Sequence, residues 1–162
     1  MFLMNKIGRP ILVLAFLMVA ALPVRAADAI DVVHSYLAAW NAHDATLAAS
    51  HFTDDVEYYD ASVGTPQKGR DAARTNVIEA FLKAAPDATW EMNGAPVVEG
   101  DSVAFEWTFA GTNKGDWSDG TKATGKTFKF HGLSLFRLRD GKIAYQGDYY
   151  DALGFYKQLG LM

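Results

Sequence analysis

An aspartate near the carboxyl terminus has the surroundings in this sequence that best suit proton transfer. Asp148 follows Gly147 and precedes the pair Tyr149 and Tyr150, so its neighbours along the chain include two aromatic side chains. A carboxylate among apolar and aromatic groups loses hydration, and its pKa should rise above the free value of about 3.9. Such a group is a better proton donor or acceptor near neutrality. The alternative is that Asp148 is a strand-end residue that bonds backbone groups or Arg137.

The residues that face Asp148 depend on a predicted hairpin. The dipeptide Asp140-Gly141 is the strongest hairpin signal in the sequence. A two-residue turn there pairs Leu133 with Asp148 and places His131 diagonally beside it. His131, the only histidine predicted on the sheet, could then orient or protonate a ligand carbonyl. The alternation around His131 is half polar, so an outward-facing His131 stays open, and a one-residue bulge would exchange the two faces.

Aromatic residues make up 13% of the chain, and a few of them are candidates for lining a ligand pocket. Tyr36 and Trp40 lie one helical turn apart and can line the same wall. Tyr59, Trp107 and Tyr150 are the other aromatic candidates for substrate binding. Most of the aromatic side chains must simply fill the core, whereas a few tyrosines with reachable hydroxyls would suit a mostly apolar pocket.

The other polar residues give weaker signals. Glu106 is predicted to point outward, as isolated charges usually do, and Asp60 suits a pocket mouth and a turn cap equally. His34, His43 and His51 lack the spacing of metal ligands, so we expect no metal site. The sequence contains no nucleophile elbow, P-loop or dinucleotide fingerprint, and the expected chemistry requires no cofactor.

The elements that would position these residues follow one another with short connections. Hydrophobic periodicity predicts helices over residues 28–42, 44–51 and 69–84, an early strand over 56–63, and a terminal helical turn over 152–160. A period of two predicts strands over residues 89–98, 102–112, 127–139 and 142–150. Helices followed by strands indicate an α+β fold, in which helices cover one face of a curved antiparallel sheet and enclose a pocket.

The amino-terminal segment is predicted to be a signal peptide over residues 1–26, followed by one domain over residues 27–162. Lys6 and Arg9 precede an apolar run over residues 11–22, and Val24-Arg25-Ala26 supplies a small-x-small cleavage site. The run is about a dozen residues long, whereas a membrane-spanning helix needs about 20. We therefore expect a periplasmic or secreted protein that has no membrane segment after cleavage.

Charge and cysteine content narrow the possible partners. Residues 1–26 carry Lys6, Arg9 and Arg25 and no acid, so their removal takes the net charge of −4 down by three, to −7. An acidic domain is a poor match for nucleic acid or an anionic membrane surface. The absence of cysteine excludes disulfides, thiol nucleophiles and thiolate metal sites. A small hydrophobic molecule is the expected partner.

Several strings in the last third of the chain resemble the SnoaL-like polyketide cyclases, a branch of the nuclear transport factor 2-like superfamily. They are FEWTFAGT at residues 105–112, TGK at 124–126, LFRLRDGKI at 135–143, DYYD at 148–151 and QLG at 158–160. The resemblance implies a cone-shaped fold with a ligand pocket. It places Asp148 at the position of the cyclases' acid/base aspartate, and Ser134 where those cyclases carry a histidine. It also implies a homodimer, since sheets of this superfamily commonly pair back to back.

Three hypotheses about function follow. The first is an exported, cofactor-independent enzyme that performs acid/base chemistry, of a cyclase, isomerase or hydrolase/lyase type, on an apolar carbonyl compound. Asp148 would move the proton, and His131 or a tyrosine would polarise the oxygen. The second is a carrier that binds a hydrophobic ligand without catalysis, which the serine at position 134 favours. The third is a dimerisation module without an enclosed pocket.

Overall fold

The computed structural model describes residues 26–162, so the predicted signal peptide lies outside the described residues except for Ala26. The elements in chain order are α1 (Ala26–Asn41), α2 (Ala45–Ser50), β1 (Phe52–Asp60), β2 (Gln67–Lys68), α3 (Arg70–Ala73), a π-helical segment (Arg74–Glu79), α4 (Ala80–Ala84), β3 (Thr89–Glu99), β4 (Ser102–Thr112), β5 (Thr127–Arg139), β6 (Lys142–Tyr150) and α5 (Ala152–Leu159). Among these residues, no helix is long and apolar enough to cross a membrane.

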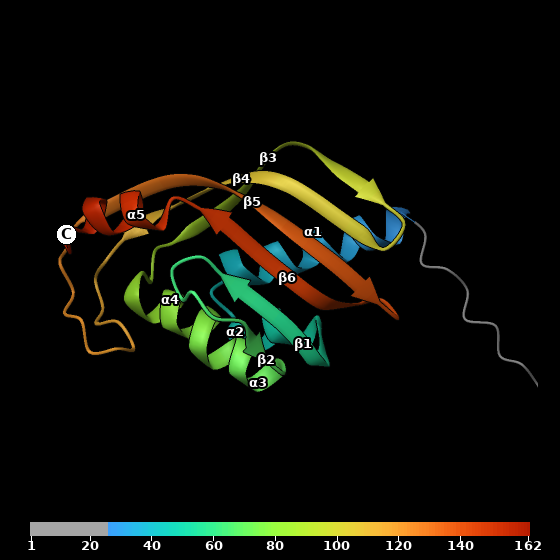
Figure 1. Cartoon of the computed structure of the whole chain (residues 1–162), viewed down its shortest axis with the longest axis horizontal. Coiled ribbons are helices and arrows are strands. Elements are labelled where there is room, and N and C mark those ends of the chain that lie inside the picture. Colours follow the sequence, from blue (N-terminus) through green and yellow to red (C-terminus); the bar gives the residue numbers. More distant parts are fainter. Residues whose placement is uncertain (1–25) are drawn as a thin grey trace, which may run out of the picture.

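Six strands form one curved sheet in the order β2-β1-β6-β5-β4-β3. Neighbouring strands are antiparallel except for β1 and β6, which run parallel. The helices cover one face of this sheet, with α1 behind the long strands and α3 and α4 beside β1 (Figure 1). The predicted α+β class and layer arrangement are confirmed. The parallel pair was not predicted, because it joins the first strand to the last one across the whole domain.

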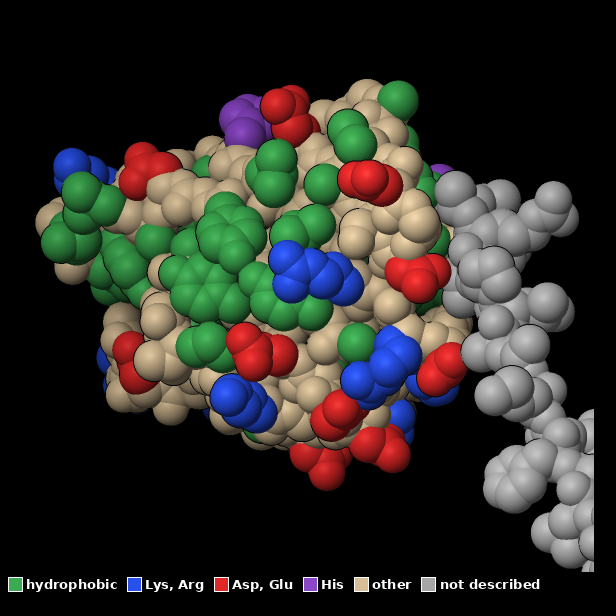
Figure 2. All heavy atoms as spheres, turned by 45° about the vertical axis from the view of Figure 1, so that its right-hand side comes forward, with side chains coloured by type: hydrophobic (Ala, Val, Ile, Leu, Met, Phe, Trp, Pro, Cys, Tyr) green, Lys and Arg blue, Asp and Glu red, His purple; other side chains and the backbone are tan. Residues whose placement is uncertain are grey.

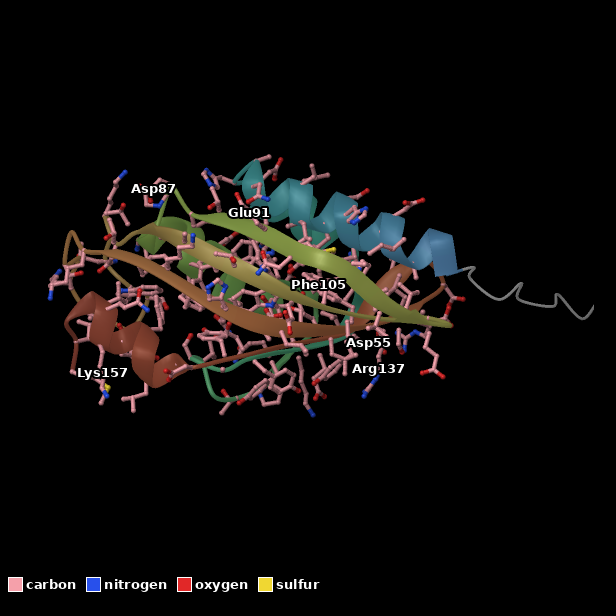
Figure 3. The ribbon with its side chains drawn as sticks, turned by 90° about the horizontal axis from the view of Figure 1, so that it is seen from above. Asp55, Asp87, Glu91, Phe105, Arg137 and Lys157 are labelled. Carbon is pink, nitrogen blue, oxygen red and sulfur yellow. The ribbon has the colours of Figure 1, made fainter. Side chains whose placement is uncertain are left out.

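The core lies between the helices and the concave face of the sheet. Strand β4 shows why, since its inward residues Val103, Phe105 and Trp107 are buried whereas Glu106 between them is exposed. Helix α1 contributes an apolar stripe at helical spacing. The buried members of that stripe are Ala29, Val33, Tyr36, Leu37 and Trp40. Seen from above, α1 runs alongside β3 (Figure 3).

Three local predictions differ from the structure. The helix predicted over residues 69–84 contains a π-helical segment in its middle, and its residues Val77, Ile78 and Phe81 face the core. The early strand, predicted over residues 56–63, begins at Phe52 and ends at Asp60. Between the predicted strand over 56–63 and the predicted helix over 69–84, the chain forms the two-residue strand β2, which pairs with β1 through Glu57 and Tyr58. Long-range pairing, which local propensity does not report, decides the strand boundaries.

The hairpin between β5 and β6 departs from its predicted register through a bulge. Arg139 pairs with Lys142 as predicted, and Asp140 and Gly141 both adopt the positive φ of a tight turn. One extra residue, Ala144, then shifts the ladder, so that Ser134 and not Leu133 pairs with Asp148. Because side chains alternate between faces, this single shift exchanges the predicted inner and outer sets of β5.

Candidate active site

A small chamber lies between the helices and the concave face of the sheet. Its cavity volume is about 20 Å³, which is room for little more than one water molecule. The residues that line it come from α1, β1, α4 and the four long strands, and are Trp40, Tyr58, Asp60, Phe81, Trp90, Trp107, Phe109, Phe130, Asp148 and Tyr150. Aromatic side chains form most of its wall, and two carboxyl groups are its only acidic groups.

Asp148 is 4% exposed and accepts three side-chain hydrogen bonds. The Ser134 hydroxyl donates to Oδ1 at 2.5 Å. The Tyr58 hydroxyl and the Gln146 amide donate to Oδ2 at 2.7 and 2.9 Å. Burial is the largest influence on the carboxyl group, followed by the charge of Asp60, and together they raise the pKa of Asp148 to about 7 although the hydrogen bonds oppose the rise.

Asp60 is the second buried carboxylate of the chamber. It pairs with Asp148 across the parallel strands β1 and β6, so both side chains point to the concave face. Its Oδ1 accepts from the Ser62 backbone and hydroxyl at 2.8 and 2.6 Å, from the Val63 backbone at 3.2 Å and from the Tyr150 hydroxyl at 2.9 Å. Burial raises the pKa of Asp60. The two roles weighed for Asp60, lining the pocket and capping a turn, are therefore both present.

Ser134 connects Asp148 to the aromatic wall. The indole Nε1 of Trp107 donates to the Ser134 hydroxyl at 2.7 Å, and that hydroxyl donates in turn to Asp148. Both residues are buried. The chain Trp107 to Ser134 to Asp148 therefore holds the carboxyl group in one orientation from the side of β4 and β5.

His131 and Tyr59 lie on the outer face of the sheet, away from the chamber. The predicted placement of His131 beside Asp148 is wrong, because the bulge at Ala144 turns it outward. His131 is exposed, and its Nδ1 lies 3.0 Å from the Thr108 hydroxyl. The Tyr59 ring packs on Tyr149 of the same face, with 5.4 Å between ring centroids. Figure 2 shows hydrophobic side chains gathered on one face among acidic and basic ones.

Of the other predicted site residues, Trp40, Trp107 and Tyr150 line the chamber. Tyr36 does not. It is fully buried behind the wall, where its ring contacts Trp90 and Phe136, and its hydroxyl has no hydrogen-bond partner among residues 26–162. Within that same part of the chain, no three histidine or acidic side chains lie close enough to hold a metal ion.

Comparison with known proteins decides the family. The sequence profile of the SnoaL-like polyketide cyclases matches residues 30–159. The chain belongs to this family.

Solved structures agree with this assignment. AclR from Streptomyces galilaeus is 25% identical, with a TM-score of 0.71 over 85% of this chain and 84% of that one. TsrD from Streptomyces laurentii is also 25% identical, with a TM-score of 0.71 over 84% and 97%. A SnoaL-like protein from Jannaschia sp. CCS1 is 15% identical, with a TM-score of 0.73 over 88% and 98%, and shows the shared fold. No curated protein sequence matches significantly.

A wider vestibule, of about 740 Å³, adjoins the chamber of this SnoaL-like domain at Phe81. Phe81, Trp117 and Phe155 contact one another there, with centroid separations of 5.5, 6.3 and 5.9 Å. They form an aromatic cluster, called the plug below, around the residue that lines both spaces. The complete lining is Ser62, Val63, Gln67, Asn76, Ala80, Phe81, Trp117, Ser118, Asp119, Thr121, Phe155, Tyr156, Leu161 and Met162. It contains no lysine or arginine.

The loop that carries Trp117 is tied to the helices by a buried asparagine. Asn113 is fully buried, and its Nδ2 donates to the carbonyls of Ala84 and Gly115 at 3.2 and 2.8 Å. Its Oδ1 accepts from the Thr124 backbone at 2.9 Å, which closes the loop on itself. The plug is therefore held by a fixed loop base, not by packing alone.

Sequence reasoning missed three residues that hold or accompany Asp148. Tyr58 and Gln146 were not candidates, because a tyrosine next to Tyr59 and a single glutamine carry no motif of their own. The sequence favours a pocket mouth and a turn cap equally for Asp60, so its residue type alone does not place it beside Asp148. The alternation of β1 carried a usable signal, since an inward Tyr58 implies an inward Asp60 two residues later.

Proposed function

We propose that this SnoaL-like domain binds a small apolar molecule with a carbonyl group and transfers a proton on it, with Asp148 as the acid/base group. The proposed reaction is of the cyclase or isomerase type and needs no cofactor. The observation that carries the proposal is the pair of neighbouring buried carboxyl groups, Asp148 and Asp60, on one chamber with aromatic walls.

The proposed chemistry requires that Asp148 be present in both its protonated and its ionised form. With a pKa raised to about 7, Asp148 is present both as acid and as carboxylate at neutral pH. Asp60 contributes to that rise through its negative charge, so the two groups titrate as a coupled pair. A carboxylate of this kind can take a proton from the carbon beside a carbonyl and return it to another atom of the same ligand.

The ligand must enter through the vestibule. The chamber holds little more than one water while Phe81, Trp117 and Phe155 are in contact, so a ligand has to displace the plug. A vestibule that lacks basic side chains favours neutral ligands over carboxylates or phosphates. We propose that the reacting group occupies the chamber and that the remainder of a larger ligand stays in the vestibule.

A carrier without catalytic activity is the second candidate. Both oxygens of Asp148 already accept hydrogen bonds from protein groups, and Ser134 stands where the cyclases of the family have a histidine. These contacts suit a carboxyl group that only shapes the pocket. In that case replacement of Asp148 would alter ligand binding modestly and no proton would be exchanged.

Export and self-association complete the proposal. The basic, apolar and small-residue regions of residues 1–26 support a signal peptide and a periplasmic or secreted location. The outer sheet face, with the exposed side chains of Leu133 and Tyr149, supports pairing of two copies. Size-exclusion chromatography with light scattering of residues 27–162, and cleavage-site sequencing of the exported protein, test these two points.

Hydrogen–deuterium exchange on a ketone tests the enzyme proposal directly. Cyclohexanone in D₂O exchanges the protons next to its carbonyl slowly, and we expect the protein to accelerate this exchange at pH 7. Asp148→Asn should abolish the acceleration, whereas Glu106→Gln on the outer face should leave it unchanged. Exchange that is no faster than in buffer, while the ketone binds, would favour the carrier.

A further inference from the structure

Gly132 leaves a gap in the inward-facing row of side chains on β5. Its neighbours in that row, Phe130 and Ser134, are buried, and its partner on β4 is Trp107. A Cβ atom at position 132 would lie 2.8 Å from Cε2 of Trp107, and closer still to Cζ2 and Cη2. Gly132 does not have a positive φ, so glycine is needed there for space and not for backbone conformation. The indole of Trp107 therefore rests directly on the backbone of β5.

This seat fixes the direction of the Trp107 N–H. The ring is 2% exposed, and the rings of Trp90 and Tyr150 meet it edge to face, with centroids 5.9 and 5.7 Å away. In this position Nε1 donates to the Ser134 hydroxyl at 2.7 Å. A larger residue in place of Gly132 would displace the indole and break that hydrogen bond.

The hydrogen bond from Trp107 determines what the Ser134 hydroxyl can do. An indole nitrogen only donates, so the Ser134 oxygen accepts, and the hydroxyl donates in turn to Oδ1 of Asp148, 2.5 Å away. Within residues 26–162 this buried hydroxyl has no third partner, so a turn that let it accept a proton from Asp148 would leave its own hydrogen without an acceptor. Ser134 therefore stabilises the ionised carboxylate, and the Trp107 N–H strengthens this donation through cooperativity.

The main influences on Asp148 act in the opposite direction. Burial and the charge of Asp60 both raise the pKa of Asp148 and favour the protonated acid. Three hydrogen bonds lower it, and the one from Ser134 has a larger effect than those from Tyr58 and Gln146. A carboxyl group must be ionised before it can accept a proton. The oriented Ser134 hydroxyl therefore keeps part of the Asp148 population ready for that step at neutral pH.

We propose that Gly132 and Trp107 are positioning residues of the site: Gly132 seats the indole, and the indole holds the Ser134 hydroxyl in the direction that favours ionised Asp148. Neither residue bonds Asp148 itself, so both act through Ser134. The proposal rests on the proposed function, because it explains how the acid/base group is kept in a reactive state.

A double-mutant cycle, measured by carbon-13 titration of Asp148 in the domain of residues 27–162, tests the part played by Trp107. Trp107→Phe should raise the pKa of Asp148 by about 0.5–1, the equivalent of about one net hydrogen bond. In the Ser134→Ala background the same change should not raise the pKa, because the hydroxyl that carries the effect is absent. Any change in that background measures what the smaller aromatic ring alone does to the chamber.

Gly132→Ala tests the seat while Trp107 is kept. The four tryptophans give four indole ¹⁵N–¹H signals, and Trp107→Phe identifies the signal of Trp107. We expect Gly132→Ala to move this indole proton upfield, since its hydrogen bond breaks, and to raise the pKa of Asp148 as Trp107→Phe does. In the Trp107→Phe background, which lacks Cζ2 and Cη2, Gly132→Ala should leave the pKa unchanged. Thr108→Val, on the outer face, is the matched control for both signals.

The pH profile of deuterium exchange on cyclohexanone gives a third readout. A change that only loosens the fold lowers the rate by the same factor at every pH. Trp107→Phe and Gly132→Ala should instead move the pH of half-maximal exchange upward, together with the pKa of Asp148.

Two results would overturn the proposal: an equal effect of Trp107→Phe on the pKa of Asp148 with and without Ser134, or a folded Gly132→Ala protein with the indole signal and the pKa of wild type. If Gly132→Ala does not fold, adding Trp107→Phe should restore folding, and failure to restore it would contradict the seat. The expected pKa changes without any deuterium exchange in wild type would support the positioning roles and contradict the proposed reaction. The two failures are therefore distinguishable.

Discussion

Successive residues of the β5–β6 hairpin alternate between the two faces of the sheet, and these two faces differ in burial and in chemistry. On the inner face, Asp148 lines the aromatic chamber and Ser134 is buried beside it, and burial raises the pKa of Asp148 to about 7. The outer face places His131, Leu133 and Tyr149 in solvent. One extra residue, Ala144, decides which set is inside. The lesson is that in a sheet the chemistry of a residue follows from its register more than from its type.

The largest expected difference between the faces concerns packing. Phe136 is fully buried and stacks on Phe105 with 5.6 Å between centroids, so Phe136→Ala should lower the free energy of unfolding by about 3–5 kcal/mol. Leu133→Ala, on the same strand but facing outward, should lower it by less than about 1 kcal/mol. Urea unfolding measures both values. Equal losses would mean that the outer face is also covered in solution.

The next effect is the pH dependence that Asp148 confers. A carboxyl group whose folded pKa of about 7 exceeds its unfolded pKa holds its proton longer in the folded state, so stability falls as pH rises from about 4 to 7. A shift of about three pKa units corresponds to roughly 4 kcal/mol. We therefore expect wild type to lose about that much more stability than Asp148→Asn between pH 4 and pH 8 in urea unfolding.

The outer face supplies the control for this pH dependence. Glu106→Gln removes an exposed carboxylate from the neighbouring strand and should change stability by less than about 0.5 kcal/mol at either pH. If the free energies of unfolding of wild type and Asp148→Asn changed with pH in the same way, the assignment of a protonated, buried Asp148 would be contradicted.

A smaller difference is expected when one side-chain hydrogen bond is removed from each face of the sheet. Ser134 donates to Asp148 and thereby lowers its pKa, so Ser134→Ala should raise the pKa of Asp148 above about 7 and reduce stability by about 1–2 kcal/mol. Carbon-13 titration of Asp148 reports the pKa. Thr108→Val removes the hydrogen bond to His131 on the outer face and should leave the Asp148 titration where it is.

The smallest expected effect is that of His131 itself. His131→Gln should leave the pKa of Asp148, the ketone exchange rate and, within about 0.5 kcal/mol, the free energy of unfolding unchanged, since the side chain is exposed on the opposite face. Carbon-13 titration, deuterium exchange on cyclohexanone and urea unfolding measure these three quantities. A clear loss of exchange in this variant would indicate that the hairpin adopts the register without the bulge.

Local pattern was sufficient for most of the fold. The period-two strands β3 to β6 and the Asp140-Gly141 turn were predicted and are confirmed. The strand boundaries of β1, the short strand β2 and the parallel β1–β6 pair were not, because each depends on residues far away in the chain. No residue type at or near Ala144 indicates a bulge, so the sequence could not decide which face of the sheet carries His131.

The sequence by itself determined the class of fold, the family and the choice of Asp148, because alternation, turn residues and motif strings are local properties of the chain. Only the tertiary structure decided what surrounds that carboxyl group. Asp60 and Tyr58 reach the chamber from β1, and the aromatic side chains of its wall come from α1, α4 and the other long strands. Burial and electrostatic coupling depend on distances in space, and those distances exist only once the sheet curves around its core.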